Sequence, residues 1–174
     1  MVSETSVQSA SIRTATTHDI EAIRLIDAQV YPLPWSSKMV HAQITGPNRL
    51  HLVAEIDGVV VGHAGILFLD DVGHVSTVAV DPSMQRRRIG FELMLTLLRS
   101  AFDKDCSAVT LEVRSGNTAA MSMYRQFAMA PTGVRRGYYA DTGDDALILW
   151  SPALDASYAQ RLGSLESAVM GDRR

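Results

Sequence analysis

The chain has 174 residues, a length that fits one domain. Hydrophobic residues make up 47% of it and charged residues 20%, which excludes intrinsic disorder for most of the chain. The formal net charge of -3 argues against a protein that binds duplex nucleic acid, because such proteins usually carry a basic surplus.

Residues 59–69 form the longest apolar stretch, which glycine and histidine interrupt. It is too short for a membrane span, which needs about 20 residues. Residues 1–10 are polar and lack the basic start and apolar stretch of a secretory signal. Cys106 is the only cysteine, so no disulfide can form within the chain. These features predict a soluble cytoplasmic protein that does not bind a membrane.

The first part of the chain predicts an arm, a strand and two helices. Residues 1–10 are expected to be a flexible arm, and the weak alternation over residues 11–16 predicts a first strand. Thr17 stands where a helix N-cap is expected, with acidic residues in the turn that follows it. Pro32 ends this helix because proline cannot continue a helix interior. Ser36 is the predicted N-cap of a second, short helix.

A run of strands follows. Residues 50–56 and 59–69 are rich in branched apolar side chains, and Asp57-Gly58 between them is a strong signal for a two-residue hairpin. Residues 75–80 predict a further strand.

The second half alternates between helical and strand patterns. The predicted elements are a helix over 88–102, a strand over 109–114, a helix over 117–128 and a strand over 146–150. The order β-α-α-β-β-β-α-β-α-β-β indicates an α+β domain over residues 11–150 with a mixed sheet. Apolar residues recur at helical spacing within 151–174, so this C-terminal extension is expected to be an optional helix.

The junction between the strand over 75–80 and the helix over 88–102 is a candidate anion site. A helix N-terminus presents unpaired backbone N–H groups and the positive end of the helix dipole. Arg86, Arg87 and Arg88 add positive charge beside it. One interpretation is a site for a phosphate-bearing ligand, and the other is a solvated basic loop before an ordinary crossover helix. These residues alone leave both open.

Residues 85–90, QRRRIG, resemble the acetyl-coenzyme A loop of the GNAT acetyltransferase superfamily, Gln/Arg-x-x-Gly-x-Gly/Ala. Arg88 stands at the place of that motif's first glycine. VAVDP at 78–82 resembles the strand that leads into this loop. Other segments resemble the bacterial ribosomal-protein alanine N-acetyltransferases: PWS at 34–36, LEVRSGNTAAMSMY at 111–124 and RRGYY at 135–139. The resemblance covers about residues 11–150 and implies a GNAT-like, mostly antiparallel central sheet with helices on both faces.

The resemblance implies roles for particular residues. Backbone groups of Val78, Ala79 and Val80 would pair with the pantetheine arm of acetyl-coenzyme A as if it were an added strand. The residues expected to wrap the pyrophosphate are Arg86, Arg87, Arg88, Ile89, Gly90 and Phe91. Asn117 would hydrogen-bond the pantetheine, although an asparagine there could equally be a plain helix N-cap.

Glu112 would be the general base and Tyr124 the general acid. A terminal α-amine has a pKa of about 7.7–8.0 against about 10.4 for lysine, so deprotonation at pH 7 costs roughly 1.2 and 4.6 kcal/mol respectively. One carboxylate acting through water could therefore serve a terminal amine. From the residues alone, Glu112 could be a solvent-facing strand carboxylate and Tyr124 a core aromatic.

The predicted function is transfer of acetyl from acetyl-coenzyme A to the N-terminal α-amine of a protein, by direct attack in a ternary complex. A ribosomal protein with an N-terminal alanine is the expected acceptor, and Trp35, Tyr138 and Tyr139 are expected to line its groove. No metal is expected, because no histidines are spaced as ligands. The alternatives are an enzyme that acetylates lysine or a small amine, and a non-catalytic module that binds coenzyme A or RNA. For the leading function, no direct binding of nucleic acid is expected.

Overall fold

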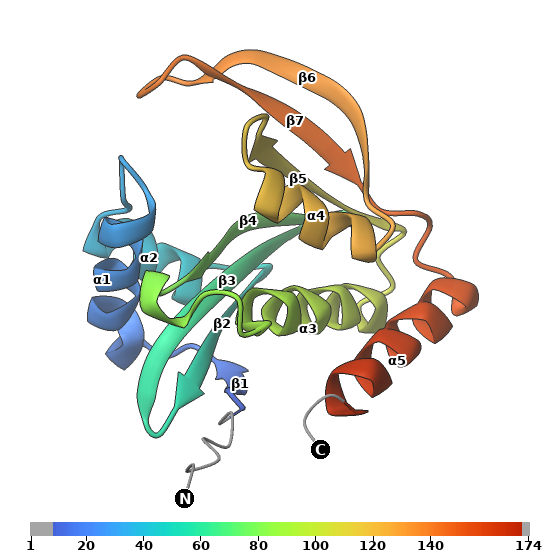
Figure 1. Cartoon of the computed structure of the whole chain (residues 1–174), viewed down its shortest axis with the longest axis horizontal. Coiled ribbons are helices and arrows are strands. Elements are labelled where there is room, and N and C mark those ends of the chain that lie inside the picture. The colour runs from blue at the N-terminus through green and yellow to red at the C-terminus, as the bar shows by residue number, and fades with distance from the viewer. Residues whose placement is uncertain (1–8, 172–174) are drawn as a thin grey trace, which may run out of the picture.

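The computed structural model describes residues 9–171, which form a sheet of seven strands in the order β1-β2-β3-β4-β5-β7-β6 (Figure 1). The strands are β1 (Ser11–Thr14), β2 (Arg49–Ile56), β3 (Val59–Leu69), β4 (Val72–Val80), β5 (Ala108–Arg114), β6 (Ala130–Tyr139) and β7 (Asp144–Trp150). All neighbouring strands are antiparallel except β4 and β5, which are parallel. The predicted element order and the mixed, mostly antiparallel sheet are confirmed. Most of the expected N-terminal arm lies outside the described residues.

Helices pack on both faces of the sheet, as expected (Figure 1). They are α1 (Ile20–Val30), α2 (Ser37–Thr45), α3 (Ile89–Asp103), α4 (Thr118–Gln126) and α5 (Ala156–Gly171). Strand β2 shows how alternation divides the core, since Leu52 and Ala54 belong to the main cluster with α3, whereas Val53 belongs to a smaller cluster with residues of α1 and α2. Between residues 9 and 171, no helix is long and apolar enough to cross a membrane.

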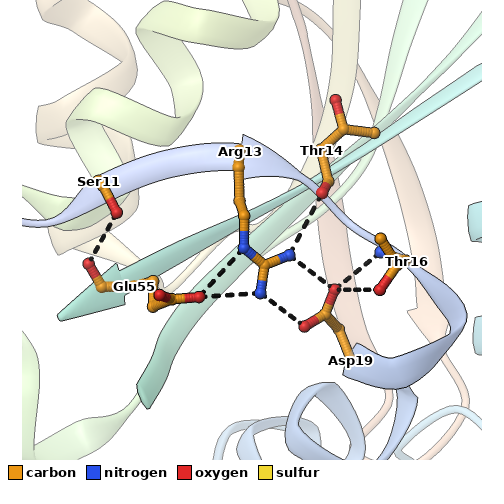
Figure 2. Close-up of polar contacts among 6 residues, drawn as sticks. All are labelled: Ser11, Arg13, Thr14, Thr16, Asp19 and Glu55. Atoms are coloured by element: carbon orange, nitrogen blue, oxygen red, sulfur yellow. Dashed lines mark hydrogen bonds and ion pairs between the residues drawn. The ribbon is translucent and has the colours of Figure 1, made fainter. Parts of the chain in front are cut away.

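The turn from β1 into α1 is held by one arginine (Figure 2). Arg13 donates to both carboxylate oxygens of Asp19 at 2.8 Å and to Glu55 on β2 at 2.9 Å. Asp19 also accepts from the backbone N–H of Thr16 at 2.7 Å. The hydrogen bond from Arg13 lowers the pKa of Asp19 to about 2. The helical turn begins with Thr16 as its N-cap, one residue earlier than the predicted Thr17, because Asp19 bonds back to Thr16.

The predicted hairpin between β2 and β3 is confirmed. Asp57 and Gly58 both have positive φ, 51° and 78°, as a two-residue turn of the mirror-image type requires. Ser36 caps α2 as expected, with its hydroxyl accepting from the backbone N–H of Met39 at 3.3 Å.

The parallel strands β4 and β5 pair over only three residues each, 72–74 with 108–110. Beyond this point they separate, and β5, β7 and β6 rise away from β4 (Figure 1). The β3–β4 register shifts between Gly65 and Ile66, so that Ser76 of β4 has no partner on β3. The fold therefore leaves one edge of β4 unpaired in the middle of the sheet.

The tail beyond β7 forms α5, the helix that the sequence pattern allowed for. Leu154, Tyr158, Leu162 and Val169 are buried in the main core. An ion pair of 2.9 Å between Arg99 and Glu166 joins α5 to α3 at the surface. The extension thus packs against the domain through an apolar face.

Candidate active site

A cleft of about 430 Å³ lies where β4 and β5 separate. Its walls come from β4 and β5, from the segment between α1 and α2, from the start of α4 and from the turn between β6 and β7. Elements far apart in the sequence therefore meet at one opening in the sheet, which is the usual arrangement of a ligand site.

The unpaired edge of β4 forms one side of this opening. The carbonyl of Val78 accepts a hydrogen bond from the Tyr31 hydroxyl at 3.0 Å, and the carbonyl of Val80 accepts from the Gln85 side chain at 3.4 Å. Because backbone groups of alternate residues point to opposite sides of a strand, Val78 and Val80 direct theirs away from β3. Ala79 faces the other way and pairs with His63 of β3. An extended ligand that adds to β4 here would share or replace the side-chain bonds to the carbonyls of Val78 and Val80.

The arginine loop adopts backbone conformations that glycine favours. Arg86 has φ 61°, and Arg88, the N-cap of α3, has φ 64°. The left-handed turn at Arg88 lets the loop lead into α3 although the motif's glycine is absent. The Ile89 and Phe91 side chains are buried in the core, so these residues can meet a ligand only through backbone N–H groups. The arginines themselves are exposed.

Glu112 lies on β5 with its side chain 12% exposed at the wall of the cleft. One carboxylate oxygen is 2.6 Å from the Nε2 atom of His74, and the other is 3.3 Å from an Nη atom of Arg135. The carboxylate is therefore held by two partners, one from β4 and one from β6. A carboxylate fixed in this way can accept a proton from a group in the cleft, directly or through a water.

Tyr124 lies on α4 and is buried, yet it also lines the cleft. Burial raises the pKa of its phenol well above the ordinary value of 10, and the neighbouring Tyr31 and Tyr139 add to the effect. The phenol is protonated at neutral pH, as an ordinary tyrosine is, and it can act as a donor. At the other end of α4, Asn117 lines the cleft and accepts from the backbone N–H of Ala120 at 3.1 Å. Asn117 is therefore the N-cap of α4, and its side-chain amide retains donors for a ligand.

Aromatic side chains also line the cleft. Trp35 lines it from the α1–α2 segment, and Tyr138 and Tyr139 line it from the end of β6. Arg114 stacks over the Tyr139 ring at 3.9 Å and forms an ion pair of 2.7 Å with Asp141 in the turn after β6. The turn between β6 and β7 is thereby fastened to β5.

The structure thus brings Val78, Glu112, Asn117 and Tyr124 together with Trp35, Tyr138 and Tyr139 around one cleft. The arginine loop lies outside the lining of the cleft and leads into α3 next to the edge of β4. Sequence reasoning missed the contacts of Tyr31 with Val78, of His74 and Arg135 with Glu112, and of Arg114 with Asp141. No motif marks them, because each joins residues that only the folded sheet brings together.

Known proteins resemble this chain over most of its length. The model of the acetyltransferase (GNAT) family matches residues 20–129. The chain is 32% identical over 153 residues to the N-alpha-acetyltransferase RimI of Mycobacterium tuberculosis, covering 84% of this chain and 95% of that protein. It is 28% identical over 144 residues to the [ribosomal protein bS18]-alanine N-acetyltransferase of Escherichia coli, covering 82% and 97%.

Among solved structures, the ribosomal-protein-S18-alanine N-acetyltransferase from Escherichia coli superimposes with a TM-score of 0.77 at 26% identity. The match covers 84% of this chain and 94% of that one. The similarity therefore extends over most of the fold.

Proposed function

The chain belongs to the acetyltransferase (GNAT) family, and from this premise we propose that it acetylates the N-terminal α-amine of a protein, using acetyl-coenzyme A. The observation that carries the proposal is the cleft itself. Glu112 from β5 and Tyr124 from α4 line the same opening as the unpaired edge of β4. A base, an acid and a backbone edge for an extended cosubstrate are then available in one place.

The residues present fit acetyl-coenzyme A. The backbone groups of Val78 and Val80 suit the amides of a pantetheine arm, because an extended chain can add to an unpaired strand edge. The N-terminus of α3 and the arginine loop suit the diphosphate, because unpaired N–H groups and guanidinium groups both bind phosphate oxygens. Asn117 is within the same lining and can bind the arm through its amide.

Bound acetyl-coenzyme A supplies an acetyl thioester for direct attack by the amine in a ternary complex. Glu112 takes the proton that the α-ammonium must lose before it attacks, with His74 and Arg135 holding the carboxylate in place. Tyr124, which is protonated at neutral pH, gives its proton to the sulfur as the carbon–sulfur bond breaks. The second proton that the acetylated nitrogen loses passes to water.

The expected acceptor is the N-terminus of a ribosomal protein that begins with alanine. The relatives from Escherichia coli are named for this activity on the ribosomal protein S18, and the matches cover 82% and 84% of this chain. In this chain Trp35, Tyr138 and Tyr139 form the wall against which a peptide backbone would lie. A terminal amine also needs less help in deprotonation than a lysine does, which suits a single carboxylate as the base.

The proposal is tested with a peptide that has an N-terminal alanine and one internal lysine, offered with and without a blocked N-terminus. Acetylation of the free N-terminus alone is expected. Glu112→Gln and Tyr124→Phe should each lower kcat/KM roughly 100-fold while leaving acetyl-coenzyme A binding by calorimetry unchanged. Glu21→Gln, an exposed carboxylate on α1, is the matched control and should be silent. Unchanged rates in both site variants would remove the proposed roles.

A further inference from the structure

The C-terminal turn of α4 closes without a glycine. Ala128, the residue after the C-cap Phe127, has φ 56°, a left-handed conformation that costs alanine more than glycine. Its N–H donates to the carbonyl of Arg125 at 2.9 Å, and the N–H of Met129 donates to the carbonyl of Tyr124 at 3.2 Å. These two bonds form the usual glycine-closed helix end, here built around an alanine.

Two further carbonyls at this end are capped by α5. A helix leaves its last four carbonyls without helical partners. The turn itself satisfies those of Tyr124 and Arg125. The carbonyl of Gln126 accepts from an Nη atom of Arg161 at 2.8 Å, and that of Phe127 accepts from the hydroxyl of Tyr158 at 2.8 Å. The carbonyls of residues 124–127 therefore all have partners, and α5 caps two of these four.

The Tyr158 contact is well placed to hold the turn. Tyr158 is 3% exposed, so water cannot readily replace its hydroxyl at the carbonyl of Phe127. Phe127 is completely buried and stacks on Phe91 in the first turns of α3, with ring centroids 4.6 Å apart. Movement of the Phe127 backbone would consequently disturb both α4 and the beginning of α3.

We propose that α5 is a positioning element for the acetyl-transfer site: Tyr158 and Arg161 cap the end of α4 and thereby hold Tyr124 at the cleft. Tyr124 is part of the capped turn, because its own carbonyl closes the bond with Met129. Opening of that turn releases the backbone that carries the phenol. The inference rests on the proposed function for the role of Tyr124, but the capping itself does not.

The test compares Tyr158→Phe, Ala128→Gly and the double variant. Tyr158→Phe removes only the hydroxyl that caps Phe127 and keeps the buried ring. It should lower kcat roughly tenfold with little change in the KM for acetyl-coenzyme A, because a small misplacement of a reacting group is costly. Ala128→Gly removes the strain of an alanine in a left-handed conformation. In the double variant it should restore kcat to within about twofold of the kcat of Ala128→Gly alone. Glu166→Gln breaks the ion pair of α5 with α3 and does not touch α4, so it is the matched control and should leave kcat unchanged.

Amide hydrogen exchange gives a readout that does not depend on activity. In Tyr158→Phe the amides of Ala128 and Met129 should exchange at least tenfold faster, and in the double variant the increase should largely disappear. If the exchange rates of these two amides are the same in Tyr158→Phe as in the wild type, the proposal that Tyr158 caps α4 is overturned. Faster exchange with unaltered kcat, or a kcat loss that Ala128→Gly does not rescue, overturns the positioning role. If the wild-type protein transfers no acetyl group, the proposed function fails, and the exchange data still decide whether α5 caps α4.

Discussion

Replacing Asp19 by asparagine should remove one of the largest pH-dependent contributions to the stability of the β1–α1 junction. The bond with Arg13 lowers the pKa of Asp19 from 3.8 to about 2. At 1.36 kcal/mol per unit, this difference corresponds to at most about 2.4 kcal/mol. Arg13 is partly exposed and solvent screens the pair, so we expect Asp19→Asn to lower the free energy of unfolding at pH 7 by about 2 kcal/mol.

The sign of the pH dependence follows from the direction of the shift. Because the folded-state pKa is depressed, the carboxylate stabilises the fold fully above the unfolded value and loses this contribution as pH falls through the folded value. The difference in free energy of unfolding between the wild type and Asp19→Asn should therefore shrink to about half of its pH 7 value by pH 3. Urea unfolding from pH 3 to pH 7 measures it. Glu21→Gln, which breaks an exposed ion pair with Arg24, should change stability by less than about 0.5 kcal/mol. A difference for Asp19→Asn that is the same at both ends of this range would refute the reasoning.

Two further substitutions test the loop and the turn beside the cleft. Arg88→Gly places glycine at a left-handed position and should raise Tm by about 2 °C in a thermal melt. A lower Tm would mean that the contacts of the Arg88 side chain stabilise the fold by more than its backbone strain costs. Arg114→Ala removes the ion pair with Asp141 and the stacking on Tyr139. Steady-state kinetics should then show a KM for the peptide about tenfold higher and an unchanged KM for acetyl-coenzyme A. Equal changes in the two KM values would contradict a role of Arg114 in shaping the peptide side of the cleft.

The parts of the fold that the sequence predicted are those with local signals. The two-residue turn at Asp57-Gly58, the cap at Ser36 and the apolar stripe of α3 each depend on neighbouring residues, and each is present. The predicted start of β4 at residue 75 falls three residues late, because pairing with both β3 and β5 extends the strand to Val72. Strand β6 gave almost no signal, since most of its residues are exposed at the edge of the sheet.

In the candidate site, too, local motifs predict some features and long-range contacts determine the others. The motif segments indicate which residues line the cleft, but the partners that hold them come from distant parts of the chain. His74 and Glu112 are 38 positions apart, and Tyr31 and Val78 are 47 apart. Such contacts depend on strand order and register, which the alternation of apolar residues does not specify. The capping of α4 by α5 belongs to the same class, since the tail pattern predicts a helix and leaves open what it packs against.

The most direct test of the account is the position of the acetyl group after the protein has been incubated with acetyl-coenzyme A and a peptide that carries an N-terminal alanine and one lysine. Fragmentation by tandem mass spectrometry should place the acetyl group on the α-nitrogen of alanine, and Glu112→Gln should slow its appearance roughly 100-fold. Acetylation of the lysine in an N-terminally blocked peptide at a comparable rate, or a Glu112→Gln rate equal to that of the wild type, would contradict it.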